Sequence, residues 1–157
     1  ADALARIAVQ NALFLGRARS SSLVIPWCTY TDPELARVGI SAEQAEQRGI
    51  AVTSFVQPFS GVDRSILDGN TRGFARVLVK RGTDRILGAT IVGEHAGELI
   101  SQVTFAMTSR RGLKHFAKSI CPYPTQMEAL RKIGDAYNRT RLSPLVLTLL
   151  RGLLAIS

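Results

Sequence analysis

Alternating apolar and polar residues mark two adjacent stretches in the middle of the chain. Residues 73–80 alternate so that one predicted face is apolar, formed by Ala75, Val77 and Val79, and this pattern predicts a half-buried strand. Residues 85–92 are apolar and β-branched, which is typical of a central strand buried on both faces. The sequence RGTD at 81–84 suits a turn between them. We therefore expect a β-hairpin within a mostly antiparallel sheet.

Three shorter strand-like segments come before this hairpin. Residues 27–31 are β-prone, and the Asp-Pro pair at 32–33 marks a turn between them and residues 36–40. Residues 51–59 form the third segment, and residues 61–69 read as a loop with one helical turn. All three segments are expected to join the same sheet.

Helical spacing is found before and between the strands. Residues 2–16 place apolar side chains on one face, and the glycine at the end of this run suits a helix stop. Ser41 and Gln44 have the spacing of a capping box, in which two side chains satisfy free amides at a helix start. A helix is therefore expected to begin at Ser41 and to end at Gly49.

The last third of the chain is predominantly helical. Residues 96–110 have an apolar face at helical spacing, and residues 113–119 form a shorter helix. Thr125 and Glu128 give a second capping-box pattern, which predicts a helix from Thr125 to about Arg139. Because most of the predicted helices follow the predicted strands in the sequence, we expect an α+β fold, a two-layer sandwich with helices packed on one face of the sheet.

Three regions are expected along the chain. Residues 1–23 read as the terminal helix of an upstream domain followed by a linker, and a helix that starts at the first residue indicates a fragment of a larger protein. Residues 24–142 form the compact domain. Residues 143–157 follow a proline and form a leucine-rich apolar helix, whose apolar face is expected to pack on the dimer.

Composition places the chain among ordinary globular domains. It has 157 residues, of which 46% are hydrophobic and 20% are charged, enough to bury a core. The net charge of +8 permits binding to polyanions, so a stand-alone basic module for nucleic acid is an alternative function. The basic residues are spread along the chain rather than gathered in a block, which makes nucleic acid a weak candidate.

Cysteine usage and hydropathy point to the cytoplasm. Cys28 and Cys121 are the only cysteines, and they lack the spacing of a zinc site or a disulfide framework. The longest apolar run, 145–156, is shorter than the ~20 residues of a membrane-spanning helix. No metal site and no membrane partner are expected.

No complete catalytic motif is present. The chain has no glycine-rich nucleotide loop, no HExxH and no GxSxG, and its histidines, His95 and His115, have no partner at motif spacing. The sequence therefore does not indicate a self-contained enzyme.

Two ordered segments carry a resemblance to a known family. The segment YTDPELARVG at 30–39 and the segment YPTQME at 123–128 resemble the C-terminal interface domain of the pyridine nucleotide-disulfide oxidoreductases, nearest the mercuric reductase-like branch. The resemblance covers nearly the whole chain. It implies a homodimer, and a parent flavoprotein whose FAD-binding domain, NAD(P)-binding domain and redox cysteine pair all lie upstream. The chain alone would then bind neither cofactor and would not be catalytically competent.

The resemblance also implies the site residues. The family often carries His-Pro-Thr followed by a glutamate, and this chain has Tyr123, Pro124 and Thr125 followed by Glu128. By analogy, Tyr123 and Glu128 complete the partner subunit's active site, and Tyr123 and Pro124 lie beside its cofactor. A phenol is a poor base at neutral pH, because its ordinary pKa is about 10. The structural alternatives are helix capping by Glu128 and packing of Tyr123 between two prolines.

Other candidate residues are interpreted as structural. Cys121 is expected to be a buried small apolar residue, Trp27 a core residue, and Arg131 and Lys132 part of a solvated helix face. The chain ends LLRGLLAIS, without the cysteine pair that mercuric reductases carry near their C-terminus. This argues against mercuric ion as the substrate.

Overall fold

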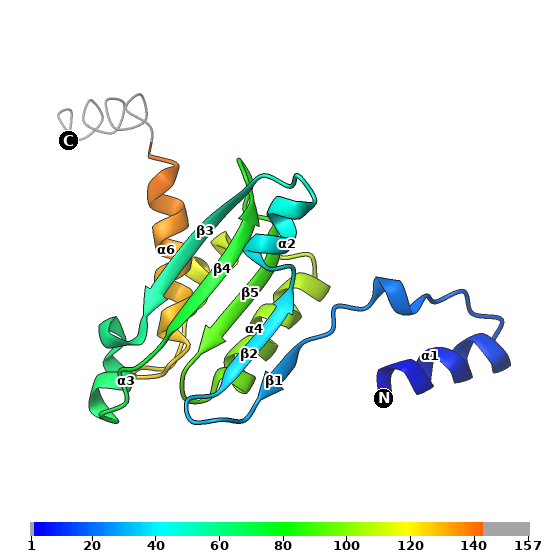
Figure 1. The fold of residues 1–157 in the computed structure, drawn as a ribbon, viewed down its shortest axis with the longest axis horizontal. Coiled ribbons are helices and arrows are strands. Elements are labelled where there is room, and N and C mark those ends of the chain that lie inside the picture. The colour runs from blue at the N-terminus through cyan, green and yellow to red at the C-terminus, as the bar shows by residue number, and fades with distance from the viewer. Residues whose placement is uncertain (1, 143–157) are drawn as a thin grey trace.

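A five-stranded antiparallel sheet forms one layer of the molecule (Figure 1). The structure, a computed structural model, describes residues 2–142. The strand order is β1-β2-β5-β4-β3, which places the predicted central strand in the middle. The strands are β1 (Trp27–Thr29), β2 (Leu35–Gly39), β3 (Val52–Pro58), β4 (Phe74–Lys80) and β5 (Ile86–Val92).

Helices form the second layer. The helix α4 packs against β2 and β5, and α6 packs against β3 and β4, so that both cover the same face of the sheet (Figure 1). The short helix α5 packs on α6. These observations confirm the predicted α+β fold. The helices are α1 (Asp2–Leu13), α2 (Ala42–Gln47), α3 (Asp63–Leu67), α4 (Ala96–Thr108), α5 (Lys114–Lys118) and α6 (Glu128–Thr140), with 3-10 turns at Ser20–Ser22 and Phe59–Gly61.

The core lies between the sheet and the two long helices. Every second side chain of the central strands faces the helices and is buried, as the alternation predicts. The cluster joins Ala36, Val38, Ala75, Val77, Val79 and Ile91 of the sheet to Leu99, Ile100, Val103, Ala129, Leu130 and Ile133 of the helices. On the other face of β5, Thr90 and Val92 are only half-buried. The prediction of burial on both faces is wrong for them, because α4 and α6 cover one face only.

The first predicted capping box is confirmed. The Gln44 backbone amide donates to Ser41 Oγ at 3.0 Å, and the Ser41 amide donates to Gln44 Oε1 at 3.0 Å. This reciprocal pair satisfies two amides that the first turn of α2 would otherwise leave free. The local pattern was therefore sufficient to place the start of this helix.

The second predicted capping box is wrong. The helix α6 begins at Glu128, and no side chain caps it. The Thr125 hydroxyl donates instead to the Pro122 carbonyl oxygen at 2.9 Å. The Glu128 amide donates to the Thr125 carbonyl at 3.2 Å, so the chain turns tightly just before the helix. Glu128 is thereby free to direct its carboxylate toward another element.

Two further predictions about burial are corrected. Trp27 is 47% exposed rather than buried in the core, because it lies on edge strand β1, where the Arg37 guanidinium lies 5.9 Å from its ring centre. Cys121 is half-buried rather than buried, in the non-helical segment between α5 and α6.

The expected tail helix at 143–157 lies outside the described residues. No helix within residues 2–142 has the length and apolar character needed to span a membrane.

Candidate functional site

The segment between α5 and α6 presents the Tyr123 side chain next to α3, and the two elements lie side by side (Figure 1). The side chain is 74% exposed. Its phenol O–H donates to Asp63 Oδ2 at 2.9 Å. Because Asp63 is the first residue of α3, this hydrogen bond joins two segments that are 60 residues apart in the sequence.

Glu128 binds the backbone of Asp63, the residue whose carboxylate accepts the Tyr123 hydrogen bond. It is only 8% exposed, and its Oε2 accepts a hydrogen bond from the Asp63 backbone amide at 3.2 Å. Its Oε1 lies 3.2 Å from Lys132 Nζ and 3.4 Å from the Arg131 guanidinium. The two cations offset the cost of burying the carboxylate, which would be large for an unpaired charge.

These contacts correct the interpretation of Arg131 and Lys132 as a solvated helix face. Both side chains pair with Glu128, and Arg131 also bonds Asp135 at 3.1 Å. Each is about one-third exposed. They therefore hold Glu128 in place rather than only keeping α6 soluble.

Tyr123 and Glu128 share one partner, Asp63, and no direct hydrogen bond joins them in the described structure. The Asp63 carboxylate binds the phenol, and its amide binds Glu128. Pro124 follows Tyr123 and is half-buried. Sequence reasoning missed Asp63, because an acidic residue in the first turn of a helix has an ordinary explanation in the helix dipole. No local pattern connects it to Tyr123.

Asp63 changes the chemistry of the phenol. The hydrogen bond to its carboxylate, together with its negative charge, raises the pKa of Tyr123 above the usual value. Tyr123 is therefore neutral at physiological pH and unsuited to act as a general base. With its proton directed at Asp63, the phenol oxygen offers its lone pairs as hydrogen-bond acceptors on the exposed side.

Neither Cys28 nor Cys121 forms a disulfide in the structure. Burial, followed by the nearby Glu34 carboxylate, raises the pKa of the Cys28 thiol, which favours the unreactive protonated form at neutral pH. Within residues 2–142, no three His, Cys, Asp or Glu side chains gather as metal ligands.

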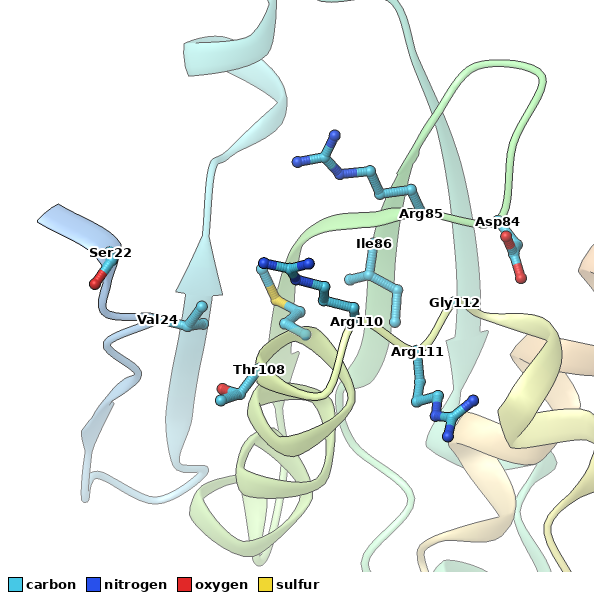
Figure 2. Close-up of a pocket in the computed structure, with 10 residues that line it drawn as sticks. Ser22, Val24, Asp84, Arg85, Ile86, Thr108, Arg110, Arg111 and Gly112 are labelled. Carbon is cyan, nitrogen blue, oxygen red and sulfur yellow. The ribbon is translucent and has the colours of Figure 1, made fainter. Parts of the chain in front are cut away.

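A cavity lies away from Tyr123, at the C-terminal end of α4. It measures about 780 Å³, and its lining includes Arg85, Arg110 and Arg111. Figure 2 shows Arg85 and Arg110 extending to the same side, whereas Arg111 points away from them. The three guanidinium groups therefore do not converge on one anion. The cluster of Tyr123, Asp63 and Glu128 is the stronger candidate site.

Comparisons with known proteins show the family to which the chain belongs. The family model described as "Pyridine nucleotide-disulphide oxidoreductase, dimerisation domain" matches residues 25–133. A mercuric reductase of Staphylococcus aureus is 32% identical over 85% of this chain and 24% of its own length. The mitochondrial dihydrolipoyl dehydrogenase of Caenorhabditis elegans is 38% identical over 71% of this chain and 23% of its own length.

A solved structure shows the same fold. The HOCl-induced flavoprotein disulfide reductase RclA of Escherichia coli aligns with a TM-score of 0.76 and 25% identity, over 83% of this chain and 30% of that chain. The chain thus spans about a quarter of the length of the curated relatives named above. The region matched by the family model includes Asp63, Tyr123 and Glu128.

Proposed function

The chain belongs to the pyridine nucleotide-disulphide oxidoreductase family, of which it forms the dimerisation domain, and from this we propose that it joins two subunits of a flavin-dependent oxidoreductase into a homodimer. Such dimers pair the same surface of each subunit. The relatives named mercuric reductase and dihydrolipoyl dehydrogenase support a parent enzyme of this kind.

The parent is proposed to be a cytoplasmic enzyme with FAD- and NAD(P)-binding domains that precede residue 24. When bound there, FAD supplies electron transfer between NAD(P)H and a redox cysteine pair, and the acceptor is a disulfide or a metal ion. This chain contains neither nucleotide loop nor cysteine pair, so we propose that it is not catalytically competent by itself.

We further propose that Tyr123 and Glu128 contribute to the partner subunit's active site. The observation that supports this is an exposed phenol held in one orientation by a hydrogen bond to Asp63. Packing does not explain that orientation, because 74% of the Tyr123 surface is exposed. In the dimer, Tyr123 and Pro124 would lie beside the partner's flavin and redox thiols, and Glu128 would fix the segment that carries them.

Mixed dimers test whether Tyr123 acts across the interface. In the parent enzyme, one subunit would lack the redox cysteines and the other would carry Tyr123→Ala. Each active site takes its thiols from one subunit and its tyrosine from the other, so one of the two sites would be intact. We expect about half of the wild-type kcat, whereas the Tyr123→Ala homodimer should lose about tenfold or more.

Tyr30→Ala is the matched control, because Tyr30 is another tyrosine with an exposed side chain. Its homodimer is expected to keep wild-type turnover. Mixed dimers that are as inactive as the Tyr123→Ala homodimer would mean that Tyr123 serves its own subunit. A fully active Tyr123→Ala homodimer would refute any role of this residue in turnover.

A further inference from the structure

An exposed tyrosine that is hydrogen-bonded to a residue held by the buried Glu128 carboxylate needs a physical reason for its orientation. We propose that Asp63 is a positioning residue, which fixes the Tyr123 phenol and directs its oxygen lone pairs toward the partner's active site. This inference rests on the proposed function, because it assigns to Asp63 the task of preparing Tyr123. None of the family features found in the sequence points to Asp63.

The backbone of Asp63 is fixed first. Its amide donates to Glu128 Oε2 at 3.2 Å, and Glu128 is itself paired with Lys132 and Arg131. The start of α3 is therefore tied to the start of α6 through a charge that two cations hold in place. Hydrogen bonds to an ionised group are stronger than those between neutral groups, so Asp63 has a defined position relative to Tyr123.

The carboxylate of Asp63 accepts a hydrogen bond from the phenol. In the described part of the chain, its one hydrogen-bonded side chain is Tyr123, at 2.9 Å, and no cation lies within ion-pair distance of it. The neighbouring Arg64 pairs with Asp68 instead, at 2.6 Å. The Asp63 carboxylate that accepts the phenol hydrogen bond is therefore not paired with a cation in the described part of the chain.

The resulting phenol is neutral and oriented. The charged groups that act on it are Asp63 from α3 and, more weakly, Glu128 from α6, and both carboxylates raise the pKa of Tyr123. Since the O–H donates to Asp63, the oxygen can only accept hydrogen bonds from outside the domain. The bond to an anion also polarises the phenol oxygen, which strengthens it as an acceptor.

The sign of the pH dependence follows from this arrangement. A raised pKa means that the neutral, correctly oriented phenol persists as the pH rises through the ordinary tyrosine range of about 10 and is lost only at higher pH. Removing the charge of Asp63 lowers the pKa of Tyr123 again. The neutral form, and the activity that depends on it, would then be lost at lower pH.

The test compares Asp63→Asn with Asp68→Asn, which removes an equal charge from the residue just after α3 that pairs with Arg64. The tyrosine 13Cζ shift in NMR reports the ionisation of Tyr123 in this chain. We expect its titration midpoint to move to lower pH in Asp63→Asn and to stay in place in Asp68→Asn. The wild-type midpoint should itself lie above about 10, and a wild-type midpoint at or below that value would contradict the inference without any variant.

Kinetics of the parent enzyme supply the second readout. Asp63→Asn is expected to lower kcat by about two- to fivefold at neutral pH, in keeping with a partly exposed hydrogen bond. It should also move the alkaline limb of the pH profile to lower pH. In a Tyr123→Phe background the same substitution should have no further effect, because the group on which Asp63 acts is absent.

The outcomes separate this inference from the proposed function. If Tyr123→Phe lowers turnover but Asp63→Asn changes neither the midpoint nor the pH profile, Asp63 is not a positioning residue and the proposed function stands. If the midpoint moves but Tyr123→Phe leaves turnover unchanged, the proposed role of Tyr123 fails. An equal effect of Asp63→Asn with and without the Tyr123 hydroxyl would assign Asp63 a purely structural role and overturn the inference.

Discussion

Leu130→Ala is expected to lower the free energy of unfolding by about 2–5 kcal/mol, the range found when a buried leucine is truncated. Leu130 is fully buried in α6 and belongs to the core cluster between the helices and the sheet. Its removal loses apolar contacts and leaves a cavity that the surrounding elements fill only in part. Urea unfolding followed by circular dichroism measures the change.

Leu67→Ala is the matched control for this substitution. Leu67 ends α3 and is 69% exposed, so its truncation should change the free energy of unfolding by no more than about 0.5 kcal/mol. Equal losses at the two positions would mean that the packing of α6 against the sheet is not the main source of stability.

Gly134→Ala is expected to destabilise the domain by about 1–3 kcal/mol, although alanine favours a helix over glycine by about 1 kcal/mol. A Cβ at Gly134 would lie 2.6 Å from the Ala117 backbone nitrogen and 3.1 Å from the Leu113 carbonyl oxygen. Both atoms belong to the backbone around α5, which rests directly on α6. The clash can be relieved only by moving one helix away from the other, and thermal unfolding would report it as a lower Tm.

Gly97→Ala provides the comparison, since Gly97 also lies in a helix, α4. There the nearest atoms to an added Cβ are the Cys28 sulfur and the Tyr30 ring, at 3.5 Å, which is an ordinary contact distance. This substitution should leave the free energy of unfolding unchanged or raise it by up to about 1 kcal/mol. A stabilising effect of Gly134→Ala would refute the close approach of α5 and α6.

Local patterns in the sequence predicted most of the fold. The alternation at Ala75, Val77 and Val79 correctly indicated the buried face of β4, because strand side chains alternate strictly between two faces. The box of Ser41 and Gln44 was equally reliable, since both partners lie within one helical turn. The same pattern failed at Glu128, because Asp63 and two cations bind its carboxylate more effectively than the helix start does.

The candidate site was only partly accessible from the sequence. Tyr123 and Glu128 were identified through a family resemblance, and the structure shows that Asp63 links them. That link depends on a loop and a short helix that meet across 60 residues of chain, and neither has a periodic pattern. Exposure at the sheet edge was also missed for Trp27, since an aromatic residue in a strand gives no indication of whether the strand is at an edge.

The most direct test of the account is the solution mass of this chain, measured by light scattering on a sizing column over a range of protein and salt concentrations. A dimerisation domain predicts a particle of twice the 17.0 kDa chain mass, with little sensitivity to salt if the shared surface is apolar. A monomer at every concentration would contradict self-association. If that monomer also bound nucleic acid with an affinity that falls steeply with salt, the net charge of +8 would indicate a polyanion-binding module instead.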